Sequence, residues 1–599
     1  MGLFRQILRV HVSEVGKGLE CARVPLDDAV YRDFVGGVGL GAYLLWRYAP
    51  AGVDPLAPEA PLIIALAPLL GTPLTTTAKL AVVCKSPLTS RISDGLSSSR
   101  FALAAKRLGV DAIVITGAAA ELSILHLDEE LGRCRLEPCR ALAGASPAEV
   151  GAALPGCHVA AIGRAGENRV RFASIANDGR HAGRGGAGAV LGAKRIKAIT
   201  VRGRAQPALA DPQAVRERAR DLAARSLGAA TDKYRRLGTV ANVETFDRLR
   251  ILPARNFQAV SIGRRKAKRL APEGLKAAAG HVREGCAGCT IGCDHRFGGT
   301  RLEYESLFAL GPLCAVDEPQ RVLAAAAACD RLGLDTISAG GTLAFAMECC
   351  ERGLLPWPLA FGDDLVPWLE RIAARDDLGD RLAEGSRRLA AEVGQGSERF
   401  ACQVKGLELP GYEPRTMQTT ALGLAVAARG ADHNRSGAYQ ADLRPGVDRF
   451  AAELEATPLR VIETEDHAAL LDSLILCKFL RGAIARPWEE SAELLAMTAG
   501  LDLDAAALRA TCARITGLRH LFNRREGWTI AEDTLPERFF AEPLDGGEVV
   551  DRELLRAMVG RYYRERGYTA EGLLDDAALG RLGLRSLAPR LPPAAAADP

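Results

Sequence analysis

Three cysteines just short of the middle of the chain have the spacing of a metal-binding site. Cys286, Cys289 and Cys293 form a C-x2-C-x3-C pattern within Cys286-Ala-Gly-Cys-Thr-Ile-Gly-Cys293. Three thiolates this close in sequence can surround one soft metal centre, and a fourth ligand then comes from elsewhere in the chain. The best remote candidate is Cys477, in Leu471-Asp-Ser-Leu-Ile-Leu-Cys-Lys-Phe479.

Two other interpretations of these cysteines remain open from the spacing alone: a structural zinc site and unrelated buried thiols. Gly285, Gly288 and Gly292 favour an iron–sulfur cluster. Glycines let backbone N–H groups approach cluster sulfurs, and such hydrogen bonds help to set the reduction potential.

Composition describes an ordinary globular protein of 599 residues, with 48% hydrophobic and 25% charged residues. A net charge of +4 is too balanced to favour nucleic acid as the main partner. We expect no membrane span, because Pro68 interrupts the most apolar run, Leu62–Leu70, which is typical of a buried strand. The N-terminus has no signal-peptide pattern, so we expect a cytoplasmic protein with reduced cysteines.

The chain changes character near residue 205. Residues 1–205 are rich in strand-like runs, and residues 206–590 are dominated by alanine, leucine, arginine and glutamate at helical spacing. We therefore expect an α+β protein with a β-rich first domain, a mainly helical region and a mobile tail at 591–599. The clearest predicted strands are Gln6–Val12, Lys79–Cys84, Ala112–Thr116 and Ala198–Val201.

Two glycine-rich stretches could bind a ligand. The first, Phe34–Ala42, opens no βαβ unit with an acidic residue at the right distance, so it does not indicate a dinucleotide site. In the second, Ala176–Gly192, Arg180 and Arg184 lie among glycines before a helix-forming run. This is a reasonable cradle for a phosphate, and the alternative is a loop with two solvated arginines.

Three stretches of the helical region could carry chemistry. Glu305 lies two residues after Glu303, and a carboxylate near a metal could transfer protons, although a solvated acidic pair fits equally well. His433 stands among polar residues that could set its tautomer, or it is simply solvated. The segments Asp330–Thr336 and Asp472–Lys478 both read Asp-x-x-x-Leu-(Asp/Cys)-x, so they could hold two similar halves of one cofactor.

In these residues and motifs, the chain resembles the aldehyde ferredoxin oxidoreductase family from about residue 5 to about residue 580. The motifs follow the order of the family, which makes their joint occurrence far more specific than any one of them. They are Gly36-Gly-x-Gly-Leu-Gly41, Lys85-Ser-Pro-Leu-Thr89, Asn177-Asp-Gly-Arg-x-Ala-Gly-Arg184, the cluster cysteines, Glu303-Tyr-Glu305 and the two aspartate-led loops.

The resemblance implies a tungsten centre, with molybdenum as an alternative, held by two pyranopterins whose phosphates share Mg²⁺. A β-rich pterin-binding base domain would carry the cofactor, and two helical domains would enclose it. Cys286, Cys289, Cys293 and Cys477 would ligate a [4Fe-4S] cluster, while Glu305 and His433 would handle protons and orient the substrate. The residues implied in cofactor binding are Lys79, Leu96, Arg180, His181, Ala182, Gly183, Arg184, Asp330, Asp335, Arg435, Asp472, Leu476 and Lys478.

Some positions depart from the family pattern. Lys79 replaces an arginine, and a lysine loses the bidentate fork. Leu96 replaces an asparagine and can offer Mg²⁺ only its backbone carbonyl. Ile475 replaces a glycine in the second aspartate-led loop. Ala324 replaces the glutamate of an iron site at the dimer interface, so we expect no such iron.

The resemblance further implies oxidation of small aldehydes to carboxylic acids, with electrons passing through the cluster to ferredoxin or a ferredoxin-like subunit. The resemblance also implies a flavoprotein partner linked to NAD, and assembly into an oligomeric complex. Two alternatives remain: a tungsten or molybdenum reductase of aromatic thioesters or other carbonyl compounds, and a non-catalytic iron–sulfur carrier subunit.

Overall fold

The strand-rich part of the chain folds into two six-stranded mixed sheets. The computed structural model describes residues 2–13, 19–129 and 133–587, so the tail predicted at 591–599 lies outside the described residues. In spatial order the first sheet contains β2 (Leu19–Pro25), β1 (Gln6–Val12), β6 (Ala112–Gly117), β3 (Leu62–Ala65), β4 (Lys79–Lys85) and β5 (Ile92–Ser98). The second contains β11 (Arg180–Ala182), β10 (Ile175–Asn177), β9 (His158–Ala161), β12 (Ile196–Arg202), β7 (Ser123–Asp128) and β8 (Arg133–Pro138).

Alternating side chains of the first sheet feed two different cores. Ile64, Val82 and Ile113 point into the core shared with the second sheet. Their neighbours Ile63 and Val83 point to the opposite face, into the core formed with the helices. Because successive side chains of a strand face opposite sides, the first sheet can be buried on both faces.

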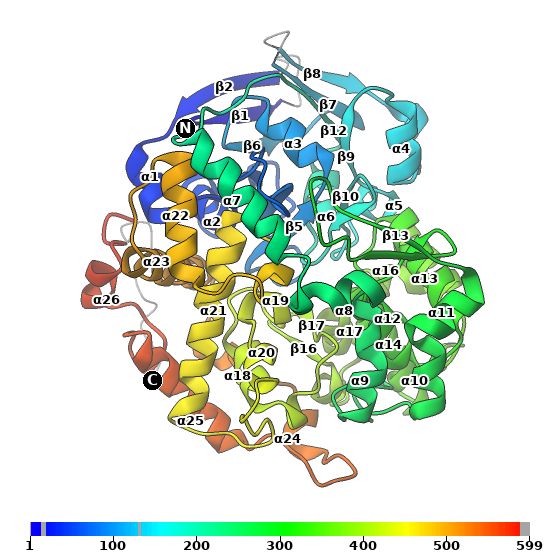
Figure 1. The fold of residues 1–599 in the computed structure, drawn as a ribbon. Helices are drawn as coiled ribbons and strands as arrows, with labels where there is room; N and C mark the ends of the chain where they lie inside the picture. Colours follow the sequence, from blue (N-terminus) through cyan, green and yellow to red (C-terminus); the bar gives the residue numbers. More distant parts are fainter. Residues whose placement is uncertain (1, 14–18, 130–132, 588–599) are drawn as a thin grey trace.

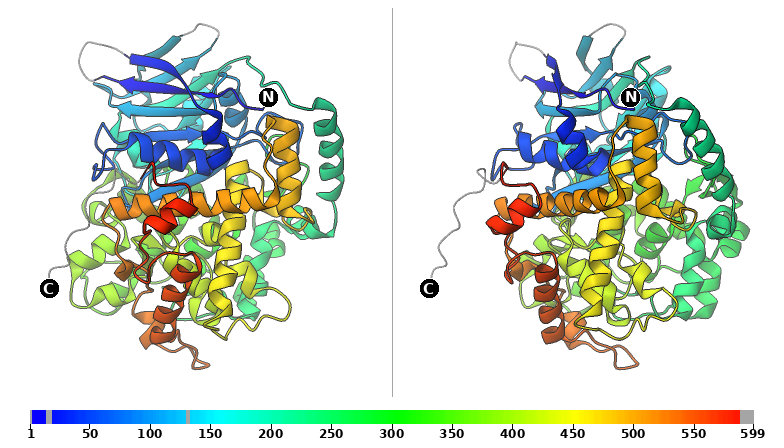
Figure 2. Two further views of the ribbon diagram at one scale, coloured as in Figure 1. Left: turned by 90° about the vertical axis from the view of Figure 1, so that its left-hand side faces the viewer. Right: turned by 60° about the vertical axis from the view of Figure 1, so that its left-hand side comes forward.

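Helices fill the rest of the molecule, from α7 (Pro212–Arg225) to α26 (Asp576–Arg581). The strand-rich part lies at the top of Figure 1 and the helices lie below it. The long helix α23 (Ala505–Arg525) runs across the underside of the strand-rich part, where it packs on α2 (Gly37–Tyr48) and β5 (Figure 2). The predicted fold class, a β-rich base followed by helical domains, is therefore confirmed. Within the described residues no helix is both long and apolar enough to span a membrane.

A buried carboxylate joins the two parts of the molecule. Asp94 on β5 accepts hydrogen bonds from Arg435 and from Arg519 of α23, the latter at 3.0 Å. Burial alone would raise the pKa of Asp94, but Arg435, Arg519 and Arg429 outweigh it and hold the pKa at about 2. Asp94 is therefore charged, and its partners come from two segments of the helical region.

We predict that Asp94→Ala lowers the free energy of unfolding by about 3–5 kcal/mol, because it leaves buried guanidinium groups without their anion. Chemical unfolding of the full chain measures the loss. Glu463→Ala is the control, since the Glu463 and Arg444 side chains are 58% and 45% exposed and such a pair contributes about 0–1 kcal/mol. Equal losses in the two variants would contradict the structural role of Asp94.

Candidate functional site

A cavity of about 370 Å³ lies between the strand-rich part and the helices. Most of the residues predicted from the sequence line it, although they come from segments far apart in the chain. They are Lys79, Leu96, Arg180, His181, Gly183, Arg184, Cys286, Cys293, Glu305, His433, Arg435, Leu476, Cys477 and Lys478. The others, Ala182, Cys289, Asp330, Asp335 and Asp472, lie outside this lining.

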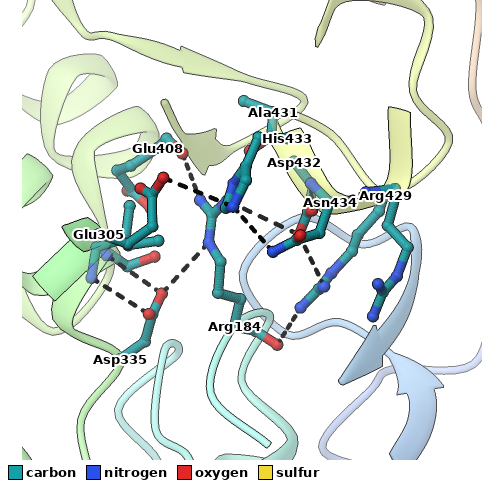
Figure 3. Close-up of polar contacts among 12 residues, drawn as sticks. Arg184, Glu305, Asp335, Glu408, Arg429, Ala431, Asp432, His433 and Asn434 are labelled. Carbon is teal, nitrogen blue, oxygen red and sulfur yellow. Dashed lines mark hydrogen bonds and ion pairs between the residues drawn. The ribbon is translucent and has the colours of Figure 1, made fainter. Parts of the chain in front are cut away.

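Arg184 lies at the centre of the polar wall (Figure 3). Its guanidinium donates to the backbone oxygens of Ala431, at 2.7 Å, and Glu408. Its Nε lies 3.7 Å from the carboxylate of Asp335, too far for a hydrogen bond, and has no hydrogen-bond partner among the described residues. Arg184 is thus fixed by the protein while one buried N–H remains available to an anionic ligand.

Arg180 is also buried, where its guanidinium contacts Asp294 at 2.7 Å. The alternative of two solvated arginines in this loop is therefore wrong. The neighbouring His181 lies 3.6 Å from Asp330, between this cavity and a groove that Asp330 helps to line. Helix α6 (Ala187–Ala193) follows, as the helix-forming run predicts.

The two aspartate-led segments have the same backbone design. Helix α13 (Pro319–Leu332) ends in a left-handed residue, Gly333, and helix α21 (Ala456–Leu474) ends in a left-handed Ile475. At each end the next N–H, of Leu334 or Leu476, bonds back to the helix at 2.9 Å. The sequence similarity therefore reflects two matching helix C-termini, as a Schellman-type turn produces.

Ile475 is strained in this conformation. A β-branched residue at φ 60° costs about 1–2 kcal/mol in backbone strain, which a glycine would avoid. Its side chain is fully buried and faces Gly37, where an added Cβ would lie 2.8 Å from Ile475 Cγ1. Packing against α2 thus helps to hold the strained turn.

Asp472 and Asp335, one from each segment, have different surroundings. Asp472 is buried and binds Arg435 at 2.9 Å and Lys478 at 3.1 Å. Its Oδ1 has no hydrogen-bond partner among the described residues. Asp335, the last aspartate of the other segment, caps α14 (Thr336–Glu351) by accepting from its first N–H groups.

The cysteine loop and Cys477 meet through two threonines. Thr75 accepts a hydrogen bond from the Thr290 N–H at 3.0 Å, and the Thr76 hydroxyl accepts one from the Cys477 N–H at 3.4 Å. Gly288 and Gly292 have left-handed φ angles of 63° and 59°, and the Gly292 N–H bonds to the Cys289 sulfur. The glycines therefore shape the loop, as the sequence predicts.

The surroundings of the cysteine loop shift the pKa values of Cys293 and Lys79. Burial raises the pKa of Cys293, and Cys477 and the other nearby acids raise it further. Burial lowers the pKa of Lys79, but Cys477, Cys286 and Asp472 outweigh this effect, so the pKa is raised overall. In the described part of the chain no group of three or more His, Cys, Asp or Glu is arranged for a single metal ion.

Glu303 and Glu305 have different environments. Glu303 is ion-paired with Arg301 and its side chain is 43% exposed, whereas the Glu305 side chain, in α12 (Tyr304–Leu310), is only 18% exposed. Burial raises the pKa of Glu305 to about 8, although the Gly411 N–H donates to its Oε2 at 3.0 Å. Its Oε1 has no hydrogen-bond partner among the described residues. The carboxyl is therefore protonated at neutral pH.

His433 is buried, so the alternative of a solvated histidine is wrong. It begins the short helix α19 (His433–Ser436), and burial lowers its pKa to about 3. The Asn434 amide donates to Nε2 at 2.8 Å, which places the proton of the neutral ring on Nδ1. Nδ1 has no hydrogen-bond partner in the described structure, and Nε2 lies 3.6 Å from Glu305 (Figure 3).

Sequence reasoning missed the aromatic wall behind this pair. The Tyr412 ring lies 5.3 Å from His433 and stacks on Tyr439 at 4.7 Å, while Tyr304 donates to the Gly411 oxygen at 2.5 Å. No spacing in the sequence links these tyrosines to His433. It also missed Asp94, for which a charged residue inside a strand-like run is a usable signal.

Comparison with known proteins identifies the family to which the chain belongs. The family model described as "Aldehyde ferredoxin oxidoreductase, N-terminal domain" matches residues 7–203, and the one described as "domains 2 & 3" matches residues 214–584. The chain belongs to the aldehyde ferredoxin oxidoreductase family and is an oxidoreductase of that type. The resemblance predicted from the motifs is thus confirmed.

Several relatives match over nearly their whole length. The chain is 34% identical to the tungsten-containing aldehyde ferredoxin oxidoreductase of Pyrococcus furiosus, covering 93% of this chain and 96% of that protein. It is 27% identical to the aliphatic sulfonate oxidoreductase, WOR-like subunit, of the same organism, covering 94% of each. The active-site complex BamBC of benzoyl-coenzyme A reductase shares the fold, with a TM-score of 0.84, 23% identity and 98% coverage of each chain.

Proposed function

We propose that the chain oxidises aldehydes to carboxylic acids at a tungsten centre held by two pyranopterins in this cavity. The observation that carries the proposal is the pair of a protonated, largely buried Glu305 and a neutral, buried His433, 3.6 Å apart at the cavity wall. The relatives named as tungsten-containing aldehyde ferredoxin oxidoreductases, at 34% identity, support the substrate class.

The residues present fit such a cofactor. Two matching helix ends supply equivalent loops for two pterins, and the unpartnered Asp472 Oδ1 and Arg184 Nε offer an acceptor and a donor for polar ring or phosphate groups. Gly183 leaves space in the wall, because an added Cβ would meet only Asp335, at 3.9 Å. Lys79, Arg180 and His181 would lie by the phosphates. The backbone oxygens of Leu96 and Ala182 would serve Mg²⁺, which prefers oxygen ligands.

The cofactor supplies a two-electron acceptor and Lewis acidity beside the substrate carbonyl. His433 orients the aldehyde, since its Nδ1–H is free to donate to the carbonyl oxygen and so makes the carbon more electrophilic. Tyr412 and Asn434 fix the imidazole from its face and from Nε2. Burial keeps this ring neutral, so the hydrogen bond is available across the physiological pH range.

Glu305 accepts the proton that the reaction releases. In its ionised form it takes a proton as water adds to the carbonyl carbon, and burial makes it a stronger base than a solvated carboxylate. The Gly411 N–H holds one oxygen, which leaves Oε1 for the transferred proton.

Cys286, Cys289, Cys293 and Cys477 would hold a [4Fe-4S] cluster, which would supply the route for electrons out of the site. The pKa of Cys293 is influenced by all three of the other thiols, which supports their grouping. Gly285 and Gly288 of the loop are exposed, so a cluster held there would lie near the protein surface. A ferredoxin-like acceptor would receive the electrons there.

Turnover tests the proposed reaction. The purified holoenzyme should reduce a viologen dye with benzaldehyde as donor and should not dearomatise benzoyl-CoA with a reduced dye. The reverse preference would assign it to the reductases of aromatic thioesters, and inactivity with both in a fully loaded enzyme would contradict both assignments.

The first kinetic prediction concerns Glu305. Because the carboxyl must be ionised and its pKa is raised to about 8, kcat/KM should rise with pH through about 8. Glu305→Gln should remove this rise and lower kcat by about 10²–10⁴-fold. Glu318→Gln, at an exposed position before α13, is the control and should behave as the parent enzyme. An unchanged profile in Glu305→Gln would refute the role of Glu305.

The second prediction concerns the space at Gly183. Gly183→Val should place methyl groups in the cavity and lower the pterin content measured by fluorescence after release, while the unfolding free energy changes by less than about 0.5 kcal/mol. Gly560→Val in helix α25 (Arg552–Glu565), where an added Cβ meets only Arg564, is the matched control. Full pterin content in Gly183→Val would contradict the placement of the cofactor.

The third prediction concerns the remote cysteine. Cys477→Ser should abolish the electron paramagnetic resonance signal of the reduced cluster or convert it to that of a three-iron form, because one iron loses its thiolate. Cys350→Ser, at another half-buried cysteine, should retain the parent signal. An unaltered signal in Cys477→Ser would exclude Cys477 as the fourth ligand.

A further inference from the structure

The two six-stranded sheets contact each other at the end of the molecule that lies opposite the helical region. Strands β2 and β8 are edge strands, one in each six-stranded sheet. They pack against each other at the top of Figure 1 without belonging to a common sheet. The contact between these two edges therefore depends on side chains.

Cys21 of β2 and Cys134 of β8 face each other across this contact. The two thiols are hydrogen-bonded to one another, and both line a cavity of about 320 Å³ beside the strands. Cys21 is exposed and Cys134 is half-buried, so small reagents can reach the pair. Neither residue belongs to the cluster-binding set or to the cofactor cavity.

The surroundings give the two sulfurs different reactivity. The hydrogen bond from Cys21 is the main cause of the lowered pKa of Cys134, and the positive charge of Arg23 lowers it further. The same hydrogen bond raises the pKa of Cys21, and burial adds to this effect. Cys134 is therefore the better thiolate former and Cys21 its proton donor.

We propose that Cys21 and Cys134 are a redox-active pair that forms a reversible disulfide joining the edge strands of the two sheets. The oxidant is a low-molecular-weight disulfide such as oxidised glutathione. This proposal stands on the contact, exposure and placement of the two thiols and is independent of the proposed catalytic function.

The reaction balances as two thiol–disulfide exchanges. The Cys134 thiolate attacks one sulfur of the oxidised glutathione, the glutathione S–S bond breaks, and one glutathione leaves as a thiol after taking a proton. The Cys21 sulfur, once deprotonated, then attacks the Cys134 sulfur of the mixed disulfide and releases the second glutathione as a thiol. Two protein thiols are oxidised, one small disulfide is reduced to two thiols, and the two protein protons end on them.

The disulfide would bridge strands that are distant in sequence and lie in separate sheets. Such a link restricts the unfolded chain and holds the two edges together, so it should raise the temperature of unfolding. Reduction would restore a contact held only by non-covalent forces. The strand-rich part would thus have a redox-dependent disulfide cross-link, remote from the cofactor cavity.

The test uses the holoenzyme under anaerobic conditions, equilibrated with buffers of increasing ratio of oxidised to reduced glutathione. Free thiols are then blocked with N-ethylmaleimide, and the chain is digested and analysed by mass spectrometry. We expect a Cys21–Cys134 cross-linked peptide, lighter than its two reduced parts by two hydrogen atoms. Its fraction should rise with the ratio and fall to zero after reduction, with a parallel shift of the unfolding temperature.

Three variants make the result decisive. In Cys21→Ser and Cys134→Ser the remaining thiol should form at most a glutathione adduct, and neither variant should show the cross-linked peptide or the temperature shift. Cys157→Ser, at another half-buried cysteine, should cross-link as the parent does. Separate labelling of Cys21 and Cys134 by N-ethylmaleimide at every ratio, or a lasting glutathione adduct on the parent Cys134, would overturn the proposal.

Discussion

The buried charge of Asp94 is the constraint on which the rest of the structure depends. It lies on the last strand of the first sheet, yet its partners Arg435 and Arg519 belong to the helical region. Arg435 also binds Asp472, the first residue of the second aspartate-led segment, and Lys478 completes the chain of charges. One connected set of ion pairs therefore fixes the base, the helix end and one wall of the cavity relative to each other.

Such a network contributes little net stability, because each buried ion loses its hydration. Its main effect is to fix the positions of the charged side chains. The proposed anionic cofactor would need cations that are already desolvated and fixed, and backbone oxygens hold Arg184 in this way. Burial also raises the pKa of Glu305 and lowers that of His433. The proposed cofactor binding and proton transfer would thus both depend on the exclusion of water.

Local sequence predicts the features that depend on local rules. The alternation of apolar residues predicts β1 and β4, and the helix at Ala187–Ala193 follows from its composition. The cysteine spacing and the two aspartate-led segments point to parts of the chain that line one cavity, because each is a single short motif.

Features that depend on the meeting of distant segments were not predicted. Nothing near His433 shows that Tyr412 covers its ring or that Glu305 faces it. The left-handed Ile475 looks unsuitable until Gly37 is seen to pack against it. Cys21 and Cys134 are unremarkable in the sequence and become a pair only where two sheet edges meet.

We propose that the cavity holds a bis-pterin tungsten centre that exchanges electrons with one [4Fe-4S] cluster. Elemental analysis of the purified native protein tests it most directly. We expect about one tungsten, or one molybdenum in its place, and about four irons per chain. Iron without tungsten or molybdenum would indicate an electron carrier, and zinc alone would contradict the assignments of both the cavity and the cysteines.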